Sequence, residues 1–272
     1  MKSKISLKIT AGIIMLLSLI TAAFRYVLLI NHIDPSNGLY TSQVLGNVFF
    51  GAVCFIVVLA LLTYFYVKKA DVKSPIKEKS VGCAIASALC ILSFAALFFT
   101  EIFNLAAGVG KPDILMIAAL VLCIPSVISF LNVFFVSIGK SKFSNLALLP
   151  AFPPLYVAVR TISLFIDTST QINASQRSFE LLTMVFAMMF LVTEASYSVR
   201  MRPDEDAEKN KKNRDARYFV CAVITAALAL IVTATYLLAV LTGKYEAGYD
   251  TCDHVLTLCF GIYAAVRAFE LG

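Results

Sequence analysis

The chain has 272 residues, of which 60% are hydrophobic and only 15% are charged, with a formal net charge of +6 and a mean hydropathy of +0.84. Soluble domains average about 45–50% apolar and about 25% charged residues, so this composition excludes an ordinary soluble protein. The net positive charge does not indicate nucleic-acid binding, because the basic residues are concentrated in short segments between apolar runs. We therefore expect the lipid bilayer as a partner and no nucleic acid.

Apolar runs recur along the chain, and each is long enough to cross ~30 Å of hydrocarbon as a helix. Every backbone amide in lipid must be bonded internally, which leaves helices or closed barrels. The runs are continuous rather than alternating, so we expect helices. The predicted spans are 7–30, 44–67, 81–104, 114–138, 146–166, 178–199, 218–242 and 254–271. The sequence thus predicts an all-α fold, a polytopic transmembrane helical bundle of about eight spans forming one integral membrane domain, 1–272.

Basic residues alternate between the two sets of loops. Seventeen lie in the N-terminal segment and the loops 68–80, 139–145 and 200–217, whereas the other connections hold three. Positively charged loops stay in the cytoplasm, so we predict a multi-pass plasma-membrane protein with both termini cytoplasmic. We interpret the long charged loop 200–217 as a solvated helix extension or an inner-leaflet contact.

Two features allow other topologies. "TAA" at 21–23 resembles a signal-peptide cleavage site, although the apolar run continues to Ile30. The last span is short and carries Arg267 and Glu270 near its end, so it crosses only if these side chains snorkel to the inner surface. Seven spans plus an interfacial helix is the alternative.

A weak internal repeat relates the two halves of the chain. "TAAFRYVLL" and "YVAVRTISL" each place an Ala-x-Arg before an outer loop, and Arg25 and Arg160 are 135 positions apart. The same shift superposes the long basic loops after the second and sixth spans. Four helices per unit cross in the same sense, which predicts two parallel repeats, 1–138 and 139–272, as in some transporters.

Prolines interrupt two spans. Pro125 falls in the middle of the fourth span and is expected to kink it. Pro150, Pro153 and Pro154 make the start of the fifth span irregular, and unwound backbone at that depth must be buried in protein or line a cavity.

Two arginines interrupt apolar runs at matching depth near the predicted outer face. Arg160, in "PLYVAVRTISLFID", lies six to seven residues from the end of the fifth span, and Arg25 is at nearly the same depth in the first. An arginine at a helix centre costs about 2.5–3.5 kcal/mol, so each side chain is expected to snorkel or to pair with a carboxylate. Glu101 and Glu180 are the natural partners, whereas Asp167 is too distant within one helix. Alternatively, both guanidiniums hold a small or lipid-attached anion, whose geometry they suit.

Glu194, in "FLVTEASYS", lies about four residues inside the cytoplasmic end of the sixth span. An intramembrane carboxylate indicates a proton relay, a cation site or a partner for a basic residue. Pairing with a cytoplasmic arginine or lysine is the simpler interpretation. Glu194 and the two arginines lie on opposite sides of the bilayer, where they can mark the two ends of one pathway.

A third group contains the chain's two histidines and neighbouring aspartates, all predicted outside. Its members are His32, Asp34, Asp250, Asp253 and His254. No zinc spacing supports a metal site here, and the seven cysteines, six of them inside apolar segments, form no disulfide or zinc framework. We expect neither metal nor cofactor.

Motifs for catalysis are missing from the sequence: it has no HExxH, no GxSxG, no Walker A and no dinucleotide fingerprint. The sequence thus favours a non-enzymatic membrane protein. One hypothesis is a carrier or receptor-like protein that binds a small solute or anionic lipid through Arg25 and Arg160. The alternative is a non-catalytic scaffold or accessory subunit whose charges only pair or snorkel.

Overall fold

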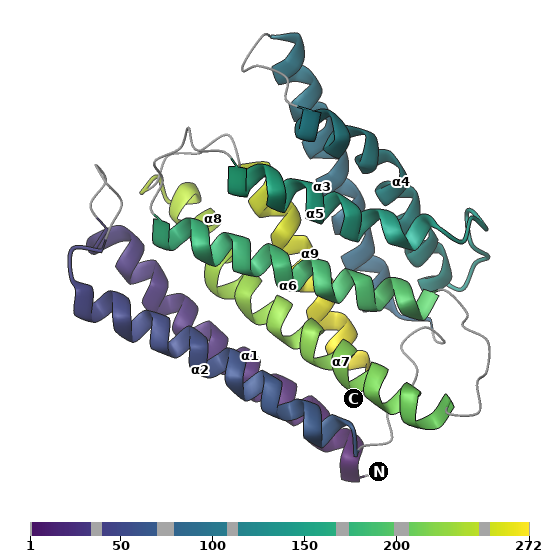
Figure 1. Ribbon diagram of the computed structural model, residues 1–272, viewed down its shortest axis with the longest axis horizontal. Coiled ribbons are helices and arrows are strands. Elements are labelled where there is room, and N and C mark those ends of the chain that lie inside the picture. The colour runs from purple at the N-terminus through teal and green to yellow at the C-terminus, as the bar shows by residue number, and fades with distance from the viewer. Residues whose placement is uncertain are drawn as a thin grey trace.

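The computed structural model (Figure 1) describes residues 2–33, 40–69, 79–107, 114–166, 174–198, 207–244 and 251–271. Within these ranges the chain is helical apart from short turns and one isolated bridge between Ile33 and Tyr40.

The elements follow one another in chain order as a series of helices. They are α1 (Lys2–Asn31), α2 (Gln43–Val67), α3 (Val81–Ala106), α4 (Ile114–Ser137), the 3-10 turn η1 (Leu149–Ala151), α5 (Phe152–Ile166), α6 (Ala174–Ser198), α7 (Ala207–Leu228), the π-helical segment η2 (Ala229–Ala234), α8 (Thr235–Leu241) and α9 (Thr251–Leu271). Eight segments of the described chain are long and apolar enough to cross a membrane. The prediction of a multi-pass, all-α membrane protein is confirmed.

The seventh span is longer than the sequence indicated. It runs continuously over Lys212–Leu241 through α7, η2 and α8. The described part of the charged loop, 207–217, is helical as expected, but Asp215 and Ala216 are buried. This helix extension therefore joins the bundle instead of being solvated on all sides.

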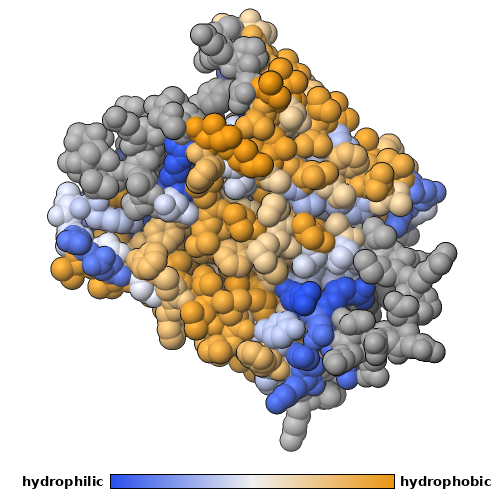
Figure 2. Space-filling view, in the orientation of Figure 1, coloured by the Kyte–Doolittle hydropathy of each residue, from blue (hydrophilic) through white to orange (hydrophobic). Residues whose placement is uncertain are grey.

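α7 and α9 form the interior of the bundle. In the most apolar stretch of each span, 72% of the residues are buried for the α7–α8 span and 61% for α9, against 28% for α2 and for α4. α1 and α2 lie together on one flank, and α3 and α4 on the other (Figure 1). The outer helices present a broad apolar surface between two hydrophilic regions (Figure 2), as expected for a lipid-facing belt.

Serine caps begin two of the helices. Ser42 accepts a hydrogen bond from the backbone of Leu45, and Ser80 accepts one from Cys83 N at 3.1 Å, which satisfies otherwise unpaired amides in the first turn. Ser80 also hydrogen-bonds Glu270, near the end of α9. One capping residue thus ties the start of α3 to the end of α9.

The prolines at the start of α5 make it irregular, as the sequence predicted. η1 contains Pro150, and α5 then begins with Pro153 and Pro154 in its first turn, where a missing N–H costs no helical hydrogen bond. α4 continues as one helix through Pro125.

The π-helical segment was not foreseen from the sequence. It lies against α9, where a Cβ added at Gly261 would come within 2.3 Å of the Cβ of Ala229. Because Gly261 has no side chain, the two helices can approach closely. Small residues at membrane helix interfaces generally have this effect.

The helix contacts do not reproduce two equivalent four-helix units. α6 packs on α7, but the corresponding α2 and α3 do not contact each other in the described chain. The parallel repeat of 1–138 and 139–272 stays a prediction.

Candidate functional site: two buried charge clusters

Arg160 is the centre of a buried ionic cluster at one end of the bundle. From α5 its Nε donates to Asp253 Oδ1 on α9 at 3.1 Å, and its Nη2 donates to the second oxygen of the same carboxylate. Nη2 also lies 3.6 Å from Glu101 Oε1 on α3. We call Arg160, Asp253 and Glu101 the Arg160 cluster.

The sequence left two simple interpretations of Arg160: its side chain snorkels to the surface, or it pairs with a carboxylate. These contacts support the pairing. The side chain is buried and does not snorkel. A two-point Arg–carboxylate contact supplies hydrogen bonds as well as charge, which offsets part of the desolvation cost. The expected pairing with Glu101 is confirmed. The main partner is Asp253, which we had expected to belong to the group that contains the two histidines.

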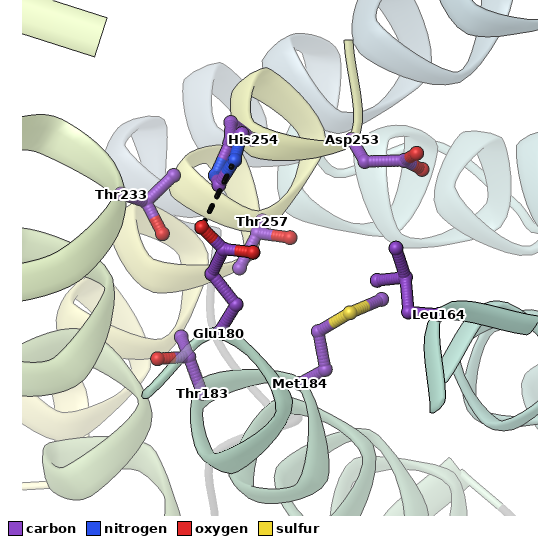
Figure 3. Close-up of a pocket in the computed structure, with 8 residues that line it drawn as sticks. All are labelled: Leu164, Glu180, Thr183, Met184, Thr233, Asp253, His254 and Thr257. Carbon is purple, nitrogen blue, oxygen red and sulfur yellow. Dashed lines mark ion pairs between the residues drawn. The ribbon is translucent and has the colours of Figure 1, made fainter. Parts of the chain in front are cut away.

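A small cleft opens beside this cluster (Figure 3). Its cavity volume is about 20 Å³, room for about one water molecule, and its walls are Leu164, Glu180, Thr183, Met184, Thr233, Asp253, His254 and Thr257. His254 Nε2 lies 3.5 Å from Glu180 Oε1, and the imidazole packs on the ring of Tyr236 with centroids 4.1 Å apart. The lining is therefore hydroxyl- and carboxylate-rich, and no arginine is part of it.

Arg25 has different surroundings. Its side chain, 1% exposed, lies with the guanidinium carbon 5.1 Å from the ring centre of Phe49 on α2 and 5.5 Å from that of Phe179 on α6. Aromatic faces attract a desolvated cation. Arg25 and Arg160 are therefore both turned into the bundle, as one hypothesis required, but neither lines the cleft.

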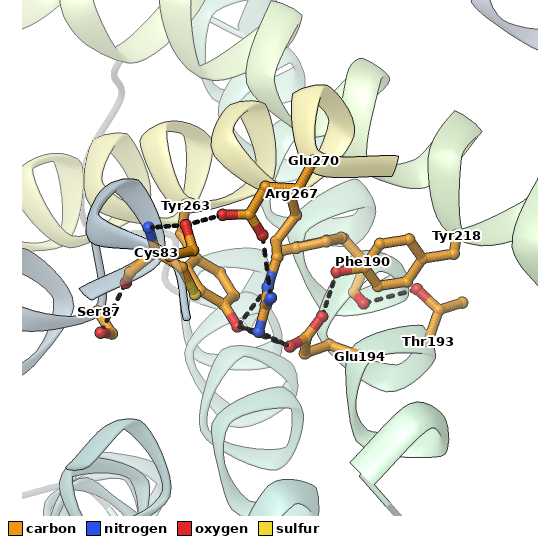
Figure 4. Close-up of polar contacts among 10 residues, drawn as sticks. Cys83, Ser87, Phe190, Thr193, Glu194, Tyr218, Tyr263, Arg267 and Glu270 are labelled. Atoms are coloured by element: carbon orange, nitrogen blue, oxygen red, sulfur yellow. Dashed lines mark hydrogen bonds and ion pairs between the residues drawn. The ribbon is translucent and has the colours of Figure 1, made fainter. Parts of the chain in front are cut away.

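Glu194 is the centre of a second buried cluster (Figure 4). Arg267 Nη2 on α9 donates to Glu194 Oε1 at 2.9 Å, and Tyr263 OH donates to the same oxygen at 2.6 Å. Tyr218 on α7 donates to the other carboxylate oxygen. The carboxylate thus has three donors from two helices.

Arg267 connects this carboxylate to the end of α9. Its Nη1 donates to Glu270 Oε2 at 3.2 Å, and its Nε donates to Tyr263 OH at 3.1 Å. The Arg267 side chain is 8% exposed, so the expectation that it snorkels to the surface is wrong: three acceptors inside the bundle replace water. We call Glu194, Arg267, Tyr263, Tyr218 and Glu270 the Glu194 cluster.

A second cleft reaches Glu194. Its cavity volume is about 20 Å³, and it is lined by Ser129, Phe130, Val133, Pro150, Pro153, Leu191, Glu194, Ala195 and Tyr263. Of the two alternatives that the sequence left open for the proline-rich start of α5, burial in protein or lining a cavity, the second applies to Pro150 and Pro153.

The two clusters share α9, and the two clefts beside them share α6. Glu180 of the first cleft and Glu194 are both on α6, fourteen positions apart, which is about 21 Å along the axis. Between the clusters lie the buried rings of Phe190 and Phe260, the latter stacked on Phe130 with centroids 6.0 Å apart. Apolar packing thus separates the two clefts.

The remaining sequence candidates form no site with these clusters in the described chain. His32 is partly exposed at the end of α1, while Asp34, Asp167 and Asp250 lie outside the described residues. Over the ranges that the structure describes, no group of three or more histidine, cysteine or acidic side chains is arranged to hold a metal ion. All seven cysteines are free thiols, and Cys252 lies in the first turn of α9 instead of a loop.

Comparisons of the chain with protein families, with curated proteins and with solved structures find no match. Function must therefore be argued from the two clusters.

Proposed function

We propose that the protein is a proton-linked membrane carrier, and that its pathway follows α6 and α9. The observation that carries this proposal is the pair of clefts, each reaching a different intramembrane ionic cluster, with aromatic packing between them. Intramembrane carboxylates that face a cavity are typical of proton and ion pathways. A lipid-facing scaffold has no need of two such clefts.

Both clusters place carboxylates beside an arginine inside the bundle. Arg160 lies within ion-pair distance of Asp253 and Glu101, and Arg267 within ion-pair distance of Glu194 and Glu270. Intramembrane carboxylates are typical of proton relays and cation sites, which supports the proposal.

The pair of Glu180 and His254 extends this argument at the first cleft. Imidazole is the side chain that ordinarily titrates near neutral pH, so this pair becomes a full ion pair only when the ring is protonated. The groups that face the ring are Glu180 on α6 and Tyr236 on α8, and Asp253 precedes it on α9. Proton occupancy of the first cleft thus couples directly to a contact between α6 and α9.

The cleft linings also bear on the solute. Carboxylates and hydroxyls favour a proton or a small, positively charged solute over the anion that the sequence suggested, because Arg160 is held by Asp253 and Arg25 lies against aromatic rings. Transport rather than catalysis is the proposed activity. Alternating exposure of the two clefts would follow the general scheme of secondary transporters, in which access switches around a central site.

Electrical recording from proteoliposomes on a solid-supported membrane tests the proposal. A jump from pH 7.5 to pH 6 should evoke a transient current in the wild type, because protons enter a buried site. Glu180→Gln and Glu194→Gln should each reduce this charge movement at least severalfold. Thr225→Val is the control, because Thr225 is also a buried polar side chain but lines neither cleft and carries no titratable group.

Two results would contradict the carrier. Wild-type currents equal to those of protein-free liposomes would favour the scaffold, the second hypothesis drawn from the sequence. Currents that appear only on addition of an anion such as phosphate or acetate, and that survive Glu180→Gln, would favour an anion carrier.

A further inference from the structure

The connection between α4 and η1 presents lysines and apolar side chains together on the molecular surface. Lys140 and Lys142 are exposed in this loop, and Lys79, just before α3, is exposed next to it. Lys79 passes directly over Gly139, where an added Cβ would lie 2.8 Å from the lysine Nζ. Three ammonium groups therefore belong to one edge of the bundle.

The loop is held in a defined conformation. The Asn132 side chain on α4 accepts from Ser144 N at 2.8 Å and donates to Ser144 O at 2.9 Å. Gly139 adopts a positive φ of 81°, which glycine tolerates, and Lys140 N donates to Phe135 O at 2.8 Å. The lysines are thus displayed by a fixed turn.

Apolar side chains accompany the lysines. Phe143 stacks on Phe135 with ring centroids 6.0 Å apart and planes 11° apart, yet it remains 61% exposed. Leu146 and Leu148 are also exposed, and the loop continues directly from α4, one of the two most lipid-exposed spans. An apolar surface beside lysines at the end of a span is typical of a bilayer interface.

The positive charge of this edge is not neutralised by the described parts of the chain. There, none of the three lysines makes an ion pair. Glu270 reaches Ser80, the neighbour of Lys79, but it is paired with Arg267.

We propose that Lys79, Lys140 and Lys142, with Phe143, Leu146 and Leu148 below them, form a docking surface for an anionic phospholipid. The lysines bind the headgroup phosphate, and the apolar side chains contact the acyl chains of the same lipid. Charge complementarity and continuity with the lipid-facing belt support this occupant. The proposal concerns lipid binding alone, so it does not depend on the proposed function as a proton-linked carrier.

Native mass spectrometry of the detergent-solubilised protein tests the surface by titration with dioleoyl phosphatidylglycerol and with dioleoyl phosphatidylcholine. The wild type should retain the anionic lipid preferentially. Each lysine near an anionic headgroup is worth roughly a fivefold change in binding, so Lys140→Gln/Lys142→Gln should weaken phosphatidylglycerol binding about tenfold or more. This double variant leaves Lys79 against Gly139, so the local packing is retained.

Lys68→Gln/Lys69→Gln is the matched control, because these lysines are also exposed, at the end of α2, and are not part of the proposed surface. It should bind phosphatidylglycerol as the wild type does. Equal binding of both lipids by the wild type, or equal losses in the two double variants, would overturn the proposal. Displacement of the lipid by millimolar inorganic phosphate would do so too, because it would indicate a site for a free anion.

Discussion

A guanidinium in the interior of a membrane protein is stable only where other groups replace the water that it has lost. Arg160 has two carboxylates, and Arg267 has two carboxylates and a phenol. Arg25 has two aromatic faces. Carboxylates, a phenol and aromatic rings thus replace water around these buried guanidiniums, and they come from several neighbouring helices.

Breaking the contact of Arg267 with Glu194 is expected to destabilise the protein strongly. In Arg267→Leu the Glu194 carboxylate loses its cation, and removing one partner of a buried pair typically costs about 3–5 kcal/mol. Tyr263 and Tyr218 can still donate to Glu194, so we expect the lower half of that range. The apparent Tm of the detergent-solubilised variant should fall by several degrees.

The double variant Arg267→Leu/Glu194→Leu is the informative control. It removes both charges and should recover much of the lost Tm, because the desolvation penalty disappears together with the attraction. A double variant that is less stable than either single variant would show that the two residues act independently.

At the level of single residues, the sequence identified charges but not their partners. Arg25, Arg160 and Glu194 are conspicuous because each interrupts an apolar run. Asp253 and Arg267 lie near the ends of the last span, where a loop position or snorkelling explains a charge equally well. Which carboxylate meets which guanidinium depends on how helices far apart in the sequence are packed, and hydropathy carries no such information.

At the level of elements, the π-helical segment and α9 approach each other closely at Gly261 and Ala229. Thr233 of this segment lines the first cleft together with Thr257 of α9. π-Helical turns within α-helices are frequent at functional sites. The shape of the cleft wall therefore depends on how closely these two elements approach each other, and hence on Gly261.

Gly261→Ala should disturb this contact. The new Cβ would lie 2.3 Å from the Cβ of Ala229, so the helices must separate. We expect a destabilisation of about 1–3 kcal/mol, the usual cost of overpacking, measured as a lower Tm and a lower yield of monodisperse protein. Gly261→Ala/Ala229→Gly should restore most of the loss, because it moves the methyl group to the other helix.

Gly12→Ala and Gly51→Ala serve as controls for the helical glycine itself. A Cβ at either position meets nothing within 4 Å. Alanine is the better helix former by about 1 kcal/mol, so these variants should be as stable as the wild type or more so. Equal effects at all three glycines would mean that helix propensity, rather than the contact with Ala229, governs Gly261.

At the level of the whole molecule, the spans could be predicted because the thickness and apolar nature of the bilayer set their length and composition. The sequence could not reveal which spans lie inside. α2 and α7–α8 have similar mean hydropathies, 2.6 and 2.4, yet 28% of the first and 72% of the second are buried in those stretches. Hydropathy does not distinguish burial in lipid from burial in protein. The same limit concealed that α9 carries members of both clusters.

The orientation of the bundle in the membrane is the subject of the last prediction. The lysine-bearing loop at 139–145 lies at the end of the Glu194 cluster, and positively charged loops stay in the cytoplasm. The exposed residues Asn145 and Lys244 lie at opposite ends of the spans. A membrane-impermeant maleimide should label Lys244→Cys in intact cells and Asn145→Cys only after permeabilisation. The reverse pattern would place the Glu194 cleft outside. Protons would then meet the Arg160 cluster from the cytoplasm, and the direction of the proposed proton-linked transport would have to be assigned the other way round.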